Sequence, residues 1–300
     1  MKKIDIFFDN VGGEILDIAL DNLKERARVV ICGAISQYSH HNSIKGPSLY
    51  LRLAEKYAVM EGFTVMHFEE KYAEASKELL NLLEEYEKSK TNSACKENFL
   101  SFVKEMWPAF INGNHHKIMA DAFKDVVDGK LKRLIINMPP RHTKSEFASF
   151  LLPSWMVGRN PKLKIIQATH TGELAIRFGR KAKTLIDSPE YAKIFETTLR
   201  EDSQAAGRWE TAQGGEYFAA GVGGAITGRG ADLLIIDDPH SEQDAMSATA
   251  MESAYEWYTS GPRQRLQPGG KIVCVMTRWS TKDLTGMLVS IQKEPKADQW

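Results

Sequence analysis

The sequence predicts an α/β protein in which two mostly parallel sheets follow one another along the chain. Short apolar segments rich in Val, Ile and Phe alternate with segments whose apolar residues recur at helical spacing. This alternation occurs both before and after a polar stretch at residues 84–98, so the 300 residues divide into about two domains. Strands that alternate with helices are expected to lie parallel, because each helix carries the chain back to the same edge of the sheet.

The first part of the chain is expected to be a partial Rossmann-like unit over residues 1–88, with a linker at 89–97. Its predicted strands are short, apolar and β-branched, and its predicted helices are longer and periodic. The order strand-helix-strand-helix-strand-helix is expected at residues 4–10, 13–26, 28–34, 48–62, 63–68 and 70–90.

The second part, residues 98–300, shows the same alternation and predicts a three-layer parallel sheet. Ligands of such a sheet are expected at the carboxyl ends of its strands. Strands are expected at residues 132–138, 163–170, 216–221, 231–240 and 271–277. Helices are expected at residues 99–110, 115–130, 145–157, 171–188, 247–266 and 280–292, with Ser280 and Asp283 as a capping box for the last one.

Composition excludes several classes of protein. The formal net charge is zero, so any nucleic-acid binding must come from a local basic patch. No apolar stretch approaches the roughly 20 residues that span a bilayer, so no membrane partner is expected. The three cysteines are far apart, and the chain begins directly as a strand without a signal-peptide pattern. These features predict a cytoplasmic protein.

The loop NMPPRHTKSE (Asn137–Glu146) has the setting of a phosphate-binding P-loop, between a strand and a helix. Lys144 supplies a cation, Ser145 a hydroxyl for Mg²⁺, and the helix that follows supplies a positive N-terminus. The usual loop reads G-x-x-x-x-G-K-[ST], and here Met138 and Thr143 stand in place of the two glycines. Considered alone, the segment is more simply a surface turn with a solvated lysine.

An aspartate pair follows the apolar strand LLIID, which is of the Walker B type. Asp237 is expected to hold Mg²⁺, and Asp238 to orient or deprotonate the attacking water. The alternative is two exposed acids in a turn closed by Pro239. The lysine loop and the acidic strand end, in this order and in these elements, predict a P-loop ATPase with ATP and Mg²⁺ as ligands.

From about residue 95 onward the sequence resembles the ATPase domain of the large terminase subunits of tailed bacteriophages. The resemblance rests on INMPPRHTKSEFAS, THTGELAIRFGRKAK, GRWETAQGGEYFAAGVGGAITGRGADLLIIDDPHSEQDA and WYTSGPRQRLQPGGKIVCVMTRW. It implies a variant P-loop without glycines. It also implies an ATP-driven motor that moves double-stranded DNA into a prohead during genome packaging. The implied partners are DNA, the portal protein, the small terminase subunit and further copies in a homo-oligomeric ring.

The resemblance also implies roles for individual residues. Lys144 and Ser145 match the phosphate and Mg²⁺ contacts, Arg141 matches a loop arginine near the γ-phosphate, and His142 and Thr143 belong to the same nucleotide-binding loop. Asp237 matches the Mg²⁺-shell acid and Asp238 the catalytic acid. Thr277 and Arg278 match a coupling motif that senses hydrolysis.

Two interpretations remain open for each of the other basic features. Arg229 is a candidate arginine finger, or an anchor for its Gly-rich loop. Arg177, Arg180, Lys181 and Thr184 share one helix face and form either a stripe that follows DNA phosphates or a solvated surface. His115 and His116 are interpreted as a pair at a helix start, near the adenine. A nuclease with clustered carboxylates is not expected in this chain.

Residues 3–85 resemble part of the zinc-independent medium-chain reductases that use NADPH, through DIFFDNVGGEILDIALDNLKERARVVICGAISQY and MEGFTVM. The resemblance implies that Asn10, Gly33 and Ser36 lie near the nicotinamide. It does not extend to that family's glycine-rich pyrophosphate turn. The alternatives to the ATPase are therefore an NADPH-dependent oxidoreductase remnant, an inactive fusion fragment that binds nucleotide or DNA, and a helicase-like translocase.

Overall fold

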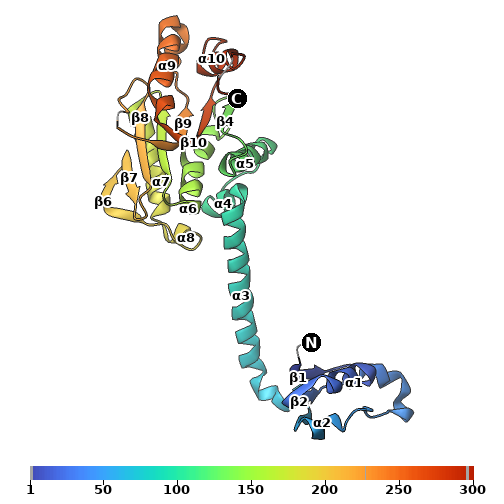
Figure 1. The fold of residues 1–300 in the computed structure, drawn as a ribbon. Helices are drawn as coiled ribbons and strands as arrows, with labels where there is room; N and C mark the ends of the chain where they lie inside the picture. The colour runs from blue at the N-terminus through green and yellow to red at the C-terminus, as the bar shows by residue number, and fades with distance from the viewer. Residues whose placement is uncertain (1–2, 227, 295–296) are drawn as a thin grey trace. The chain divides into compact units, whose positions relative to one another are not determined.

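The computed structural model describes residues 3–226, 228–294 and 297–300, and it divides into two compact units, Met1–Glu84 and Glu85–Trp300. Each unit contains a sheet with parallel strands, so the predicted α/β class is confirmed. Figure 1 labels the helices and strands. No helix within the described ranges combines the length and the apolar character that crossing a membrane requires.

The first unit is a three-stranded parallel sheet in the order β1-β2-β3. Its small core consists of apolar residues of helix α1 and strand β2, among them Leu20 and Val29. The elements are β1 (Ile4–Asp9), α1 (Gly13–Asp21), β2 (Leu23–Ile31), η1 (Ile35–Ser43), α2 (Arg52–Glu55), β3 (Val59–Gly62) and η2 (Val65–Lys71).

The third strand of this unit lies earlier in the chain than predicted. Residues 63–68 were expected to be a strand, but β3 occupies Val59–Gly62 and the 3₁₀ segment η2 follows it. The expected helix at 48–62 is reduced to the single turn α2. Both segments carry mixed apolar and charged residues, so periodicity alone does not separate strand from helix there.

Helix α3 (Tyr72–Glu97) is continuous through the segment that was expected to be a linker, residues 89–97. Its sequence is rich in Glu, Lys, Leu and Ala, which favour helix even where few contacts support it. Near its end Cys95 is buried, and its carbonyl oxygen accepts a hydrogen bond of 2.8 Å from the indole Nε1 of Trp155. The last turn of α3 is therefore packed within the second unit.

The second unit contains a seven-stranded sheet in the order β4-β10-β9-β5-β8-β7-β6. In this order the first five strands, β4, β10, β9, β5 and β8, are parallel to one another. Strands β7 and β6 continue the sheet as antiparallel neighbours. The strands are β4 (Arg133–Asn137), β5 (Lys164–Thr169), β6 (Leu199–Ala205), β7 (Arg208–Thr211), β8 (Glu216–Gly221), β9 (Ala231–Asp237) and β10 (Leu266–Met276). Strands β6 and β7 were not predicted, because LREDSQA and RWET lack an apolar run.

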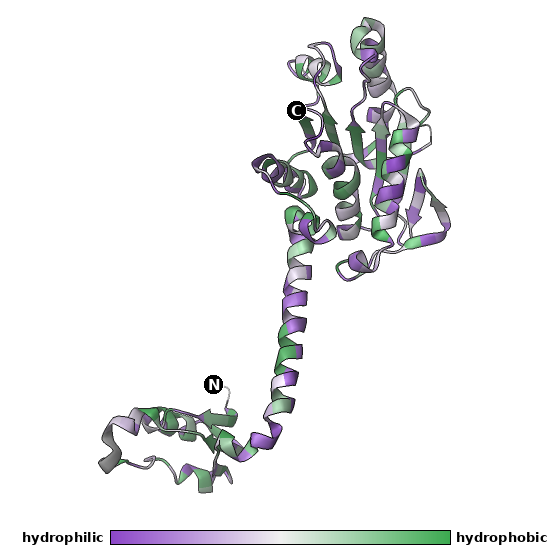
Figure 2. Ribbon diagram, turned by 180° about the vertical axis from the view of Figure 1, so that it is seen from behind, coloured by the Kyte–Doolittle hydropathy of each residue, from purple (hydrophilic) through white to green (hydrophobic). Residues whose placement is uncertain are grey.

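Helices cover both faces of this sheet. Along β9, Leu233 and Ile235 pack into one core cluster, whereas Leu234 and Ile236 pack into the other. This alternation means that both faces are buried, as expected for parallel strands, and Figure 2 colours these central strands as hydrophobic. The first face is covered by α4 (Phe99–Met106), α5 (Asn114–Val127), η3 (Glu146–Leu151), α6 (Leu152–Arg159), α7 (Gly172–Ile186) and α8 (Pro189–Ala192). The second is covered by α9 (Ala248–Ser260) and α10 (Leu284–Ile291), with the short turns η4 (Asp244–Met246) and η5 (Pro262–Arg265) nearby in the chain.

Two helix starts differ from the sequence expectation. The helix after the lysine loop contains the π-helical turn η3 at Glu146–Leu151, and α6 follows from Leu152. Ser280 does not cap the last helix. Asp283 is the N-cap of α10, and its Oδ1 accepts a hydrogen bond of 2.8 Å from the Gly286 amide.

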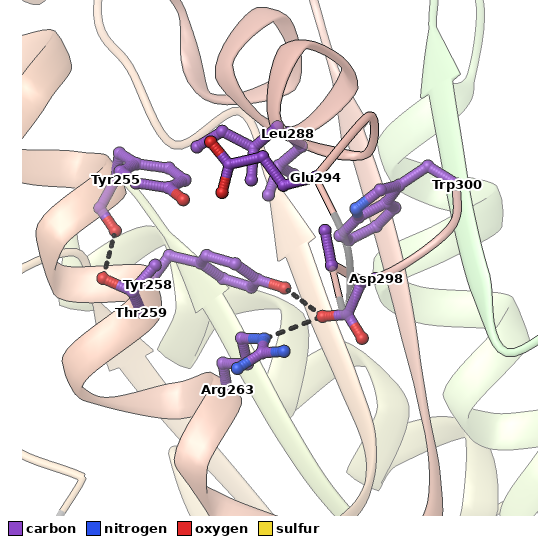
Figure 3. Close-up of a pocket in the computed structure, with 10 residues that line it drawn as sticks. Tyr255, Tyr258, Thr259, Arg263, Leu288, Glu294, Asp298 and Trp300 are labelled. Carbon is purple, nitrogen blue, oxygen red and sulfur yellow. Dashed lines mark hydrogen bonds and ion pairs between the residues drawn. The ribbon is translucent and has the colours of Figure 1, made fainter.

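The segment after α10 closes a cavity of about 230 Å³ against α9 and η5, shown in Figure 3. Asp298 is one of the lining residues, and it accepts hydrogen bonds from Arg263 Nε at 2.7 Å and from the Tyr258 hydroxyl at 3.4 Å. Asp298 also pairs with Arg133, the first residue of β4. Asp298 therefore connects the lining of this cavity to the start of β4.

Candidate active site

The lysine loop adopts a backbone conformation that usually requires glycine. Thr143 has a φ of 61° and Arg141 a φ of 63°, both in the left-handed region. Thr143 occupies the second glycine position of the usual P-loop, so a β-branched residue here takes the conformation at a cost of about 1–2 kcal/mol. Met138, at the first glycine position, instead extends the strand pairing, since its amide donates to the Met276 carbonyl at 3.1 Å.

The loop brings Lys144 and Ser145 to the end of β9. Lys144 Nζ lies 2.8 Å from Asp238 Oδ2, and only 7% of the lysine side chain is exposed. The Ser145 hydroxyl donates to Asp237 Oδ1 at 2.9 Å. A cation, a hydroxyl and two carboxylates thus meet where parallel strands end and a helix begins.

Asp237 is held by serine hydroxyls on both oxygens. Ser149 donates to its Oδ2 at 2.7 Å, and Gln167 on β5 donates to the Ser149 hydroxyl at 3.0 Å. Burial and the nearby Asp238 raise the pKa of Asp237 to about 7, although the two serines and Lys144 act in the opposite direction. Burial disfavours the charged carboxylate of Asp237, and a bound cation would offset that cost.

Ser149 and Gln167 were not identified from the sequence. The available signals were weak: Ser149 lies four residues after Ser145, hence on the same helix face, and Gln167 is a polar residue inside an apolar strand. Both side chains are fully buried.

Thr277 joins the cluster through its main chain, whereas Arg278 does not join it. The Thr277 amide donates to Asp238 Oδ1 at 2.8 Å, so this carboxylate is fixed between β10 and Lys144. Arg278 Nε donates to Asp283 Oδ2 at 2.9 Å, and the guanidinium also binds the Ser280 carbonyl. The arginine of the expected coupling pair is therefore engaged at the start of α10.

Arg229 lies at the opposite end of the parallel strands from the two acids. It forms an ion pair with Glu216, and its guanidinium lies 4.1 Å from the ring centroid of Phe218. Glu216 is level with the first residue of β5, whereas Asp237 is level with the last. Five residues of strand separate the two levels by about 16 Å, so Arg229 does not reach this chain's own acidic pair in this structure.

Arg141 and His142 lie on the solvent side of the loop, where both are exposed. His142 Nδ1 is 2.9 Å from the Pro140 carbonyl oxygen. The Arg141 guanidinium has no ion-pair partner within the described part of the chain, so it remains available to a charged group that enters from solvent.

Of the basic stripe on α7, Lys181 is bound to the helix that follows the loop. Its Nζ lies 2.6 Å from Glu146 Oε1 and 4.9 Å from the Phe150 ring centroid. Arg177 and Arg180 border a cavity with His170 and Thr171 at the start of α7. Arg177, Arg180 and Thr184 are exposed, so most of this helix face is open to solvent.

The residues present suit a magnesium ion that is shared with a substrate phosphate. Within the described ranges, no group of three or more His, Cys, Asp or Glu side chains could enclose a metal. Ser145 and Asp237 would supply two oxygen ligands to such an ion. Mg²⁺ commonly keeps several waters and binds through one or two carboxylates plus phosphate oxygens, and this donor set fits that mode.

In the first unit, Asn10, Gly33 and Ser36 meet at the carboxyl ends of β1 and β2. The Ser36 hydroxyl donates to the Val11 carbonyl at 2.6 Å, and the Ile35 amide donates to the Asn10 carbonyl. Asp9 fixes the preceding turn by accepting from the Val11 and Gly12 amides at 3.0 Å each.

Comparison with curated proteins finds reductases that are similar to part of the chain. A (+)-pulegone reductase of Mentha piperita is 39% identical over 67 residues, 22% of this chain and 19% of that protein. A 2-alkenal reductase (NADP(+)-dependent) of Nicotiana tabacum is 40% identical over 74 residues, 24% and 21% respectively. Prostaglandin reductase-3 of Mus musculus is 34% identical over 84 residues, which are 27% of this chain and 22% of that protein. The chain thus spans about one-fifth of the length of each.

Among solved structures, the large terminase of bacteriophage HK97 aligns with 66% of this chain and 41% of that chain. The identity is 14% and the TM-score 0.43, values too low to establish a shared function. No family model matches the sequence.

Proposed function

We propose that the second unit hydrolyses ATP with the help of Mg²⁺ at the junction of the lysine loop and β9. One observation carries this proposal: Lys144 and Ser145 lie within 2.9 Å of Asp238 and Asp237. The pairing joins a helix start to two acids far along the chain, with a separation of 92 residues between Ser145 and Asp237. The proposed layout is that of a P-loop NTPase.

The roles of the residues follow from their chemistry. Lys144 binds the β- and γ-phosphates, together with main-chain N–H groups at the helix start. Ser145 and Asp237 hold Mg²⁺, and Asp238 accepts a proton from the attacking water or orients it. Bound Mg²⁺ neutralises charge that develops on the phosphates. Because Lys144 is paired with Asp238 in this structure, phosphate binding must draw the lysine away from the acid and so free the acid for water.

We further propose that hydrolysis drives movement of double-stranded DNA during phage genome packaging, in the host cytoplasm. The support is the resemblance of residues 95–300 to large terminase subunits. The portal protein, the small terminase subunit and other copies in a ring are the proposed partners. Arg229 would serve as an arginine finger only toward the site of a neighbouring subunit, because it lies away from its own.

The test is ATP hydrolysis by the full chain, with and without double-stranded DNA, compared with Lys144→Ala. We expect Mg²⁺-dependent hydrolysis that DNA increases and that Lys144→Ala abolishes. Lys162→Ala, which removes an exposed lysine elsewhere on the second unit, is the matched control and should hydrolyse ATP as the native chain does. Equal background rates in native and Lys144→Ala proteins would mean that the site is an inactive remnant.

A second candidate is an NADPH-dependent oxidoreductase site in the first unit. The observation in its favour is the 34–40% identity to the reductases over 67–84 residues. A titration that follows NADPH fluorescence tests it. Saturable NADPH binding that is lost in Gly33→Trp would support the reductase hypothesis. The substitution should disturb the site, because any side chain at Gly33 meets the Tyr38 hydroxyl. No change in fluorescence would eliminate it.

A further inference from the structure

His116, on the first turn of α5, contacts the lysine loop through a chain of hydrogen bonds. The Gly113 amide donates to His116 Nδ1 at 2.8 Å. On the other side of the ring, Nε2 is hydrogen-bonded to the hydroxyl of Thr143. That hydroxyl donates in turn to the His142 carbonyl at 2.6 Å.

The donors and acceptors fix the direction of this chain. Since a main-chain N–H can only donate, His116 Nδ1 must be an acceptor and carries no proton. The neutral imidazole then has its proton on Nε2 and donates it to Thr143 Oγ1, whose own proton goes to the His142 carbonyl. The neutral form is favoured, because burial and the rings of His115 and His142 lower the pKa of His116.

The imidazole is held on its faces as well as at its nitrogens. It lies 4.8 Å from the ring centroid of Phe110 and 4.9 Å from that of Phe147, and only 5% of the residue is exposed. A ring held in this way cannot swing to solvent without losing its contacts to Phe110 and Gly113, which precede α5, and to Phe147 of η3. It is therefore a rigid support for the threonine hydroxyl.

Thr143 needs such support because of its backbone conformation. Its φ of 61° is left-handed, and a β-branched side chain disfavours that region. The unfavourable energy is comparable in size to what one or two hydrogen bonds contribute. The next residue is Lys144, so relaxation of Thr143 to an ordinary φ would turn the lysine and Ser145 away from the acids.

We propose that His116 is a positioning residue that replaces the missing glycine of the phosphate loop. It holds Thr143 in the left-handed conformation, so that Lys144 and Ser145 face Asp238 and Asp237. The proposal rests on the proposed ATPase function for its purpose, but the conformational part concerns this chain's own residues alone. His116 acts through Thr143 and does not touch the reacting groups.

The test is a double-mutant cycle between His116→Ala and Thr143→Gly in the full chain. Glycine adopts a positive φ without strain, so it makes the support unnecessary. The first measurement is hydrogen–deuterium exchange of the loop peptide without nucleotide. His116→Ala is expected to speed exchange of the loop by about tenfold, as for loss of one or two hydrogen bonds. In the Thr143→Gly background the same substitution should have almost no effect.

The second measurement is affinity for the magnesium complex of a fluorescent ATP analogue. His116→Ala should weaken binding, and Thr143→Gly should restore it in the double variant. Lys117→Ala is the matched control, because Lys117 follows His116 on the same turn of α5 but is exposed to solvent. It should leave loop exchange unchanged.

The outcomes separate the two proposals. If His116→Ala speeds loop exchange equally in the native and the Thr143→Gly backgrounds, the histidine supports α5 in general and the positioning role is refuted. Unchanged exchange in His116→Ala refutes it as well. If the cycle behaves as expected but the native chain binds no nucleotide, the positioning role stands and the ATPase proposal fails.

Discussion

Lys144 Nζ lies 2.8 Å from Asp238 Oδ2, and the lysine is almost fully buried. The cation that would bind phosphate is thus already neutralised by the acid that would activate water. Neither group can perform its proposed role until this pair separates. On the proposed function, nucleotide binding and the freeing of Asp238 would be one event, which would link occupancy of the site to readiness for hydrolysis.

Asp238→Asn should separate binding from hydrolysis. Hydrolysis is expected to fall by about 10²–10⁴-fold, the usual contribution of a general base. Affinity for the nucleotide should be retained or increase, because Lys144 no longer has a carboxylate to leave. The measurements are steady-state hydrolysis and a binding titration. Asp232→Asn, at the other end of the same strand, should leave both unchanged. A large loss of affinity in Asp238→Asn would contradict the model of competition for Lys144.

Ser149→Ala should destabilise the second unit although it removes one oxygen atom. The hydroxyl bridges Asp237 and the buried Gln167, and its loss leaves the Gln167 amide without that partner. Leaving a buried polar group unsatisfied costs about 1–3 kcal/mol. Denaturant unfolding measures the change. The control is Ser154→Ala, whose equally buried hydroxyl bonds only to the Phe150 carbonyl of its own helix. Equal effects of the two substitutions would show that the bridge to Asp237 contributes nothing special.

Gly179→Ala should disrupt the contact between α7 and the antiparallel edge of the sheet. A Cβ at this position would lie 2.5 Å from the Ala206 carbonyl oxygen and 2.7 Å from the Tyr217 ring. Overpacking of this kind costs about 1–3 kcal/mol. Gly172→Ala in the same helix would meet no atom closer than 3.8 Å. It should be neutral or slightly stabilising. Thermal unfolding of the two variants gives the comparison, and a stable Gly179→Ala protein would argue against close packing of α7.

His240 should make the second unit less stable as the pH falls below about 6.5, the ordinary pKa of histidine. Burial lowers the pKa of His240, against the opposing effect of Asp283 and Asp244. Its Nε2 accepts a hydrogen bond of 3.0 Å from the Leu284 amide, and protonation of Nε2 removes this bond. Between the folded and unfolded pKa values the unfolded chain binds the extra proton, so stability rises with pH there, by at most about 1.4 kcal/mol per pH unit.

The measurement is unfolding free energy against pH for the native chain and His240→Gln. Glutamine can accept the same amide but does not titrate, so the native curve should fall more steeply on acidification. The raised pKa of Asp237 has the opposite sign, because its folded form retains a proton that the unfolded form has released. Only the difference between the two curves isolates His240. Parallel curves would refute this role.

The sequence by itself determined the local features of the site. The apolar runs of β4, β9 and β10 were recognisable because both of their faces are buried. Lys144, Ser145, Asp237 and Asp238 were recognisable because they directly follow or precede such runs. Elements with mixed composition, such as β3 and β6, were missed or misplaced, since neither period dominates there.

The tertiary structure decided which of the candidate residues meet. Asp237 and Ser145 are brought together by the pairing of parallel strands, which local sequence does not encode. The same packing placed Arg229 beside Glu216 at the other end of the strands and turned Arg278 toward Asp283. The sequence had suggested that both arginines belong to the site around Lys144. It also added Ser149 and His116, whose roles depend on partners distant in the chain. Residue type sets the chemistry that each side chain can perform, and only the folded backbone sets the distances over which those side chains can act together.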